Sequence, residues 1–330
     1  MVRVLRLGWR LVSGAAIVVV GLSLVTFLLV RVAPGDAAVN VAASRAAGST
    51  TTEQIERIRK ELGLDRSLPI QYLQWTAKAL RGDLGRSART NRPVRTELAG
   101  RLGTTLQLAG LSSGAALLFG VAGGITAALS RRRSVSGVVR GVALLGVSVP
   151  NFWLSYLLIL VLAERLRLLP TSGRGGVRTW IMPVVVLALP AASTLSRIVA
   201  SALRDSLSQP FVTAAQARGS SRWQILRRDA FPHASAAIVS TAGALVGGMF
   251  AGTLIAEVVF AWPGVGSYYI AAVGFRDVPA IQASVAVLGI GFVVVSRAAD
   301  LIHWLVDPRL RRPNNRVVPN PGTTGISVGS

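Results

Sequence analysis

The stretch that decides the fold runs from residue 211 to residue 230 and reads "FVTAAQARGSSRWQILRRDA". It is rich in arginine and small residues, and it lies between two apolar segments, residues 180–200 and 236–260. A charged stretch in this setting indicates that the chain leaves an apolar environment here and then returns to it.

Local signals predict a short helix in the first half of this stretch. Pro210 and Phe211 suit a first helical turn, where proline's missing N–H costs no hydrogen bond. Gly219 is expected to end the helix. The alanines between them favour a helix and give it a surface of small side chains: Ala214, Ala215 and Ala217.

A second short helix is predicted to follow at once. Ser221 and Gln224 have the spacing of a capping box. The helix that begins there carries Trp223, Ile225 and Leu226. The stretch is therefore predicted to form a helix-turn-helix elbow.

The composition points to lipid on either side of this elbow. Of the 330 residues, 51% are hydrophobic and only 15% are charged. Uncharged runs recur at about the 18 to 20 residues that a bilayer crossing requires, and the first is too long for the apolar part of a cleaved signal peptide. We predict an all-α membrane protein with six transmembrane helices: Leu11–Val30, Leu102–Leu129, Gly141–Ala163, Trp180–Ala200, Ala236–Phe260 and Val278–Ala299.

Several function classes are disfavoured. The net charge of +22 comes from arginines in the gaps between apolar runs, with no basic face carrying interleaved aromatics, which argues against nucleic-acid binding. Cysteine is absent, and His233 and His303 lie far apart, so a His/Cys metal site is not expected. Lys60 and Lys78 lack the preceding glycine of a nucleotide-binding P-loop, so energy must come from a partner.

Positive charge predicts the orientation, because short loops rich in Lys and Arg stay in the cytoplasm. It places both termini and the elbow there. Between residues 41 and 101 we predict two amphipathic surface helices, one ended by Gly63 and one started by Pro69. The expected regions are the first helix with an extracytoplasmic loop (1–101), a five-helix core (102–306) that includes loop 201–233, and a disordered cytoplasmic tail (307–330).

"FVTAAQARG" followed by "ILRRDAFPHA" resembles the cytoplasmic EAA motif of ABC importer permeases. Nearly the whole chain resembles their peptide-type members, which transport dipeptides, oligopeptides and, in some cases, nickel. The other stretches that carry the likeness are "RVAPGD", "ELGLDRSLPIQYLQW", "RGDLGRS", "GVSVPNFW", "EVVFAWPGVG" and "LVDPRLR". Ala37 and Asp229 depart from the family, which often has proline and histidine there.

The resemblance implies a type I importer permease fold in the cytoplasmic (inner) membrane. The elbow would be a coupling helix that docks on an ATPase, with Ala215 and Ala217 on the approaching face. The implied partners are a second permease in a heterodimer, two ATP-binding subunits or domains, and an extracytoplasmic solute-binding protein. ATP and Mg would be bound by the ATPases, and no cofactor by this chain. The implied coupling residues are Phe211, Ala214, Ala215, Ala217, Arg218, Gly219, Ser221 and Trp223.

Import of di- or oligopeptides is the function that this resemblance favours. Import of nickel or another small solute is the alternative within the family. An ATP-independent channel or carrier is the alternative from another class, but it would not need the elbow. A membrane enzyme is disfavoured because no H-E-x-x-H zinc helix and no convincing Ser/His pair is present.

Other residues have two open interpretations. Glu257 lies near the end of the fifth predicted span, where a structural hydrogen bond or a re-entrant turn is favoured over substrate contact. Pro150, Pro183 and Pro190 can line a pathway by breaking helices or kink them for packing. Glycines within residues 120–124 can mark close helix packing or simply the glycine content of membrane helices.

Overall fold

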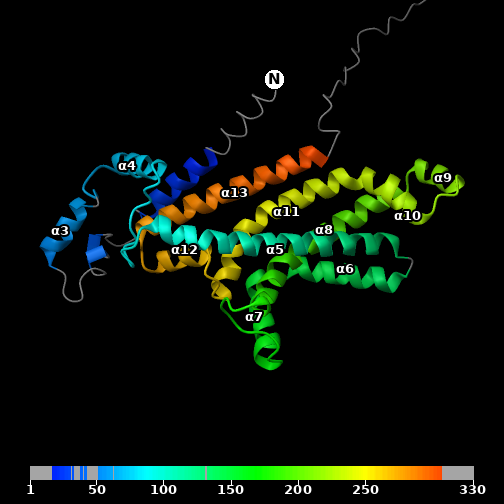
Figure 1. Ribbon diagram of the computed structural model, residues 1–330, viewed down its shortest axis with the longest axis horizontal. Coiled ribbons are helices and arrows are strands. Elements are labelled where there is room, and N and C mark those ends of the chain that lie inside the picture. The colour runs from blue at the N-terminus through cyan, green and yellow to red at the C-terminus, as the bar shows by residue number, and fades with distance from the viewer. Residues whose placement is uncertain are drawn as a thin grey trace, which may run out of the picture.

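The computed structural model is an elongated bundle whose longest helices run along one axis (Figure 1). The elements from Thr52 to Val306 are all helices, as predicted. The tail 307–330, the start of the first predicted span and most of "RVAPGD" lie outside the described residues. The structure describes residues 17–30, 32, 38, 39, 41, 42, 51–61, 63–130 and 132–306.

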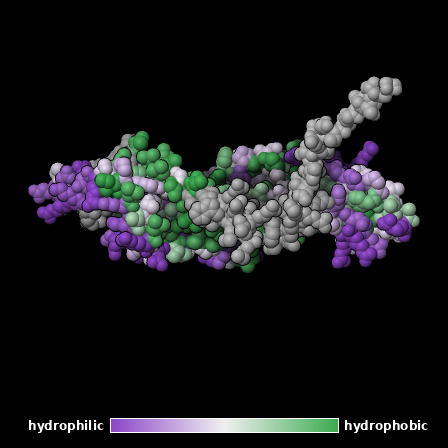
Figure 2. Space-filling view, turned by 90° about the horizontal axis from the view of Figure 1, so that it is seen from above, coloured by the Kyte–Doolittle hydropathy of each residue, from purple (hydrophilic) through white to green (hydrophobic). Residues whose placement is uncertain are grey.

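Four described helices are long and apolar enough to cross a membrane. Each exceeds the roughly 20 residues that match the hydrocarbon core. Figure 2 shows hydrophobic residues along the middle of the molecule and hydrophilic residues at its two ends. The four are α5 (Val94–Leu129), α8 (Val177–Leu207), the run Arg222–Val259 through α10, η2 and α11, and α13 (Val278–Val306), apolar to Ala299.

These four helices contain four of the six predicted spans. The first predicted span is described only as the helix Ile17–Val30, which by itself is too short to cross. A fifth crossing among the described residues depends on a pair of helices joined by a sharp bend.

That pair lies where the third span, residues 141–163, is predicted, and it is broken at Pro150, one of the two outcomes expected for that residue. α6 (Arg133–Ser148) and the run Asn151–Arg165, formed by α7 (Asn151–Leu158) and the π-helix η1 (Ile159–Arg165), meet at 109°. Val149 is extended, with φ −88° and ψ 123°. Pro150 causes the break, because its ring disfavours a helical residue before it and it has no N–H to donate.

The predicted glycine cluster does mark close packing. α5 and α8 lie side by side, and Gly120 and Gly124 are buried between them. A Cβ at Gly120 would lie 2.9 Å from Leu195 Cβ, and one at Gly124 would overlap Val199. These glycines are required because the two backbones approach too closely for a side chain.

Pro183 and Pro190 lie inside α8 and do not end it. The Thr194 hydroxyl donates to the Pro190 carbonyl at 3.0 Å. α8 therefore passes through both prolines as one long helix, in contrast to the chain at Pro150. α8 packs against α5, α6 and α11, and neighbouring helices of this kind hold a helix together across a proline.

The two predicted surface helices are present, at the end of the bundle opposite to α9 and α10 (Figure 1). α3 spans Thr52–Glu61 and α4 spans Leu68–Leu80; Gly63 separates them with φ +65°, and Pro69 lies in the first turn of α4. α12 (Val265–Gly274) joins α11 to α13 at the same end.

Asp277 attaches the loop after α4 to this end of the bundle. Its Oδ2 accepts a hydrogen bond from the Ser87 hydroxyl at 2.5 Å, and its Oδ1 accepts from the Ala280 N–H at 3.3 Å. Asp277 and Ser87 are each 2% exposed. One carboxylate thus caps α13 and holds a loop that lies far away in the sequence.

Candidate coupling loop

The first helix of the loop, α9, begins where the sequence predicts. It spans Pro210–Ala217, with Pro210 in the first turn and Gln209 as the N-cap in an extended conformation (φ −75°, ψ 150°). Proline at this place fixes a helical φ and leaves no donor unpaired.

Gly219 ends α9 in a left-handed conformation, with φ +82°. Its N–H donates to the Gln216 carbonyl at 2.9 Å, and the Ser220 N–H donates to the Ala215 carbonyl at 3.1 Å. This bond pair is the Schellman motif, in which the residue after the cap is glycine because a Cβ would be strained there. No atom lies within 4 Å of the place where a Cβ would be.

The predicted capping box is present at the start of α10 (Arg222–Ile225). The Ser221 N–H donates to Gln224 Oε1 at 2.8 Å, and the Gln224 N–H donates to Ser221 Oγ at 3.3 Å. The chain therefore passes from one helix to the next within four residues, and both helix ends are satisfied by local bonds.

A π-helical turn joins α10 to α11 (Phe231–Val259). This turn, η2 (Leu226–Ala230), is closed by a bond from the Phe231 N–H to the Leu226 carbonyl. Pro232 follows in the first turn of α11 and has no N–H, so the wider turn lies where the regular bond pattern is interrupted. The Ser206 hydroxyl donates to the Ala230 carbonyl at 3.0 Å and ties the junction to α8.

The inner face of the loop is a small hydrophobic cluster. Val212, Ala215 and Ile225 are 5%, 1% and 2% exposed and pack together. Ala215, expected on the approaching face, instead lies on this inner face. The Phe211 ring is half-buried and lies 5.5 Å from the His233 ring, between centroids. Sequence reasoning missed His233 as a partner of Phe211.

The outer face carries the other predicted coupling residues. Ala214, Ala217, Arg218, Gly219 and Ser221 are exposed, and Trp223 is 64% exposed. Arginines of α10 and η2 are exposed as well: Arg222, Arg227 and Arg228. Asp229 is half-buried. The outer face thus carries several cations, small alanine side chains along α9 and one exposed aromatic ring. These groups suit contact with a protein surface that is partly acidic and partly apolar.

The far end of α11 holds a different arrangement around Glu257, which is fully buried. Glu257 Oε1 accepts from the Thr105 hydroxyl at 2.7 Å, and Oε2 accepts from the N–H groups of Gly266 and Ser267 at 2.7 and 3.1 Å. The Thr105 hydroxyl in turn accepts from the Val265 N–H at 2.9 Å.

These bonds confirm the structural interpretation of Glu257. Its carboxylate caps the first turn of α12, where orphan N–H groups favour an anion. It lies directly against Gly264, where a Cβ would overlap it. Thr105 carries no sequence signal for this role, whereas Asp277, placed just before a helix, has the pattern of an N-cap that sequence reasoning did not use.

The described residues contain no group of three or more His, Asp or Glu side chains that could hold a metal ion. The exposed guanidinium groups and the exposed indole ring of the loop can make charged and apolar contacts with another surface.

The sequence matches two family models. Residues 120–312 match the family described as binding-protein-dependent transport system inner membrane component. Residues 1–109 match the corresponding N-terminal family of membrane components. The first match includes the whole of loop 201–233.

Relatives with similar sequences are named as permeases. A Brucella abortus (strain 2308) protein named "Putative peptide transport system permease protein" is 33% identical over 308 residues, with 91% of this chain and 97% of the relative covered. The "Probable D,D-dipeptide transport system permease protein" of Escherichia coli K12 is 31% identical, with 91% and 95% covered. The glutathione transport system permease protein of Escherichia coli O6:H1 is 33% identical, with 88% and 93% covered.

Solved structures share the fold. An inward-facing MetNI methionine ABC transporter chain aligns with a TM-score of 0.54 at 20% identity, covering 66% of this chain and 99% of that chain. A chain of an amino acid ABC transporter crystallised with histidines aligns with a TM-score of 0.51 at 17% identity, covering 63% and 93%. At these identities the likeness describes the arrangement of helices alone.

Proposed function

Because the chain belongs to the inner-membrane components of binding-protein-dependent transport systems, we propose that it is the permease subunit of an ATP-driven importer of di- or oligopeptides. The observation that carries this proposal is 33% identity over 91% of the chain to a protein named as a peptide permease. The relatives named for D,D-dipeptide and glutathione transport support the same class of cargo.

The subunit lies in the cytoplasmic membrane with six spans and with both termini in the cytoplasm. The described helices supply four of these spans, or five with the bent pair. The last turn of α5 and the first turn of α6 lie at the same end as α9 and α10, and α3 and α4 lie at the other end (Figure 1). This arrangement fits the inference that arginine-rich turns stay in the cytoplasm.

The outer face of loop 201–233 docks on the ATPase subunits, which bind ATP and Mg. Docking needs a projecting surface that moves together with the spans. Ile225 and Leu226 are buried, and the Ser206 hydroxyl holds the junction to α8. Movement of the loop would therefore be carried directly into α8 and α11.

A second permease subunit, in a heterodimer, and an extracytoplasmic solute-binding protein complete the transporter. Large exposed hydrophobic side chains on α6 and α7 provide surface for lipid or for the second permease: Leu144, Leu145, Phe152, Trp153 and Tyr156. The end that carries α3 and α4 is the side to which the solute-binding protein delivers cargo.

Uptake by cells that lack this gene tests the proposed cargo. A labelled dipeptide and labelled nickel are supplied separately, with and without the gene restored on a plasmid. The proposal expects that only dipeptide uptake depends on the gene. Loss of nickel uptake with unchanged dipeptide uptake would instead favour the family's metal importers, and dipeptide uptake that survives removal of the partner ATPases would favour an ATP-independent carrier.

Cysteine labelling tests the orientation, since the chain has no cysteine of its own. Arg218→Cys in the loop and Glu56→Cys in α3 each place one exposed thiol at an opposite end of the molecule. An impermeant maleimide applied to intact spheroplasts should label only the second variant. Labelling of position 218 from outside would overturn the proposed topology.

A further inference from the structure

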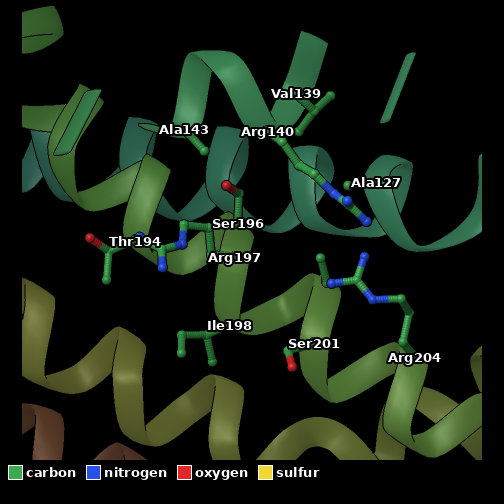
Figure 3. A pocket seen from close by; sticks show the side chains of 11 residues that line it. Ala127, Val139, Arg140, Ala143, Thr194, Ser196, Arg197, Ile198, Ser201 and Arg204 are labelled. Carbon is green, nitrogen blue, oxygen red and sulfur yellow. The ribbon is translucent and has the colours of Figure 1, made fainter. Parts of the chain in front are cut away.

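A cavity of about 500 Å³ lies between α5, α6 and α8 (Figure 3). Its size is within the range of small-ligand sites. Three of its lining residues are arginines, and three carry hydroxyl groups, of which those of Thr194 and Ser196 donate to carbonyls of their own helix. The residues that the argument uses are Arg140, Thr194, Arg197, Ser201 and Arg204.

Arg197 lies inside the predicted fourth span, three residues before its end, and Arg140 and Arg204 lie just beyond the predicted third and fourth spans. Arg197 lies ten residues before the end of α8, about 15 Å along the helix axis at 1.5 Å per residue. Arg204 follows two turns later on the same face. Arg140 comes from α6, and in Figure 3 its side chain and that of Arg204 extend toward the same space, while Arg197 lies beside Thr194.

Among the residues that the structure describes, no carboxylate lines this cavity. α6 contains no acidic residue, and the last acidic residue of α5 is Glu97, far from Ala127 in the lining. Asp205 is the acidic residue of α8, and it lies one position beyond Arg204 and so on a different face. The described chain therefore provides three cations without a counter-charge.

Like charges that line one cavity repel each other unless water or an anion reaches them, and Arg197 also lies inside a predicted span, so these charges are typical of a functional site. Guanidinium groups bind carboxylates through paired, charge-assisted hydrogen bonds, which makes a carboxylate a fitting ligand. The hydroxyl of Ser201, another residue of the lining, can supply a further polar contact. Each unmodified peptide carries one carboxylate at its C-terminus.

We propose that Arg140, Arg197 and Arg204 form an anion site that binds the carboxylate of the cargo peptide in the half of the pathway nearest the coupling loop. This rests on the proposed function. Arg204 lies two residues before Ser206, which is bonded to the loop junction at Ala230. The site thus lies where movement of the coupling loop can alter the positions of its cations.

A single introduced thiol tests the site. Ser201→Cys places it in the cavity of a cysteine-free chain, within the complete transporter in inside-out vesicles. The rates of modification by an anionic (sulfonatoethyl) and a cationic (trimethylammonioethyl) methanethiosulfonate are compared on this subunit. We expect the anionic reagent to react on the order of tenfold faster, because three nearby cations raise its local concentration.

Arginine substitutions and a peptide then identify the cause. Arg140→Gln, Arg197→Gln or Arg204→Gln should each lower the anionic preference at least about threefold. Arg133→Gln, two turns earlier on α6 and outside the lining, is the matched control and should leave it unchanged. Excess dialanine should slow modification, and dialanine amide, which lacks the carboxylate, should not.

Equal rates for the two reagents, or a preference unaffected by all three substitutions, would overturn the site. A preference that follows the anionic lipid content of the vesicles without protection by dialanine would assign the arginines to lipid phosphate and reject the proposal. If the thiol at position 201 is modified only when the second permease is removed, the three arginines would be assigned to a counter-charge on that subunit. If the unsubstituted transporter takes up dipeptide but dialanine does not protect the thiol at position 201, this inference alone is refuted. If the unsubstituted transporter takes up no dipeptide, the proposed function itself is refuted.

Discussion

One helix-turn-helix junction lies at each end of α11, and the two are built in opposite ways. At its start, the turn between α9 and α10 is held by bonds between residues at most five positions apart, and Gly219 has open space around it. At its end, the turn into α12 is held by Glu257 and Thr105, which are 152 residues apart, and Glu257 has no exposed surface.

The difference indicates which junction can serve as a contact surface for another protein. Local bonds allow the first turn to keep its shape while its outer face contacts another protein. Long-range bonds make the second turn part of the packing that joins α5, α11 and α12, so it cannot change without disturbing the bundle. Changes at the two junctions should therefore have different consequences, the second affecting stability and the first affecting transport.

Glu257→Leu should have the largest effect. It leaves the Thr105 hydroxyl and the N–H groups of Gly266 and Ser267 without their acceptor in a buried site. Unpaired buried polar groups cost about 1 to 3 kcal/mol each, so we expect a loss on the order of 3 kcal/mol or more. Membrane abundance and the thermal unfolding midpoint of the solubilised protein measure it.

Two controls accompany this variant. Glu257→Gln keeps one acceptor oxygen and should be intermediate, and Glu164→Leu replaces an exposed carboxylate and should change little. Normal abundance and an unchanged midpoint for Glu257→Leu would show that the hydrogen bonds to Glu257 do not hold the bundle together.

Gly264→Ala should destabilise the same junction less. The added Cβ overlaps the Glu257 carboxylate, and overpacking of this kind costs about 1 to 3 kcal/mol. The comparison is Gly274→Ala at the other end of α12, where no atom lies within 4 Å of the new Cβ. A lower unfolding midpoint is expected for the first variant only; equal midpoints would mean that the close approach at Gly264 is not needed.

Gly219→Val should impair transport while leaving the subunit in the membrane. The left-handed conformation costs a residue with a Cβ about 1 to 2 kcal/mol, and valine adds bulk to the docking face, but no buried contact is lost. We expect normal abundance, weakened association with the ATPases or uncoupled ATP hydrolysis, and little dipeptide uptake.

Gly173→Val is the matched control, because Gly173 has a similar φ of +88° and equally open surroundings outside the coupling loop. It should carry the same backbone strain yet retain uptake. Full uptake by Gly219→Val at normal abundance would reduce loop 201–233 to a segment that only sets topology.

Ser221→Ala should have the smallest effect. It removes one half of the capping box, worth about 1 kcal/mol, from the first turn of α10. The unfolding midpoint should stay within error, and dipeptide uptake should fall only in part because the loop becomes less rigid. Ser220→Ala, one residue earlier and outside the box, is the comparison; an equal fall in both variants would argue against a role for the cap.

Local sequence patterns account for the parts of the fold that were predicted well. The elbow, the surface helices α3 and α4, and the long apolar helices depend on bonds or spacings within a few residues. Proline in a first turn, glycine after a last turn and serine three residues before glutamine act in the same way in any surroundings. The family resemblance read from those stretches is likewise borne out by the family match.

Tertiary structure decided what depends on distant neighbours. Pro150 breaks its helix by 109°, whereas α8 continues through Pro190, and the residue itself does not distinguish the two outcomes. Ala215 faces inward because Ile225 covers it. Glu257 is structural because Thr105 and the first turn of α12 pack against it, and Arg140 lines the same cavity as Arg204 only because α6 lies along α8. The sequence determines each helix, but pairing between helices is set by packing over the whole bundle, which no local pattern encodes.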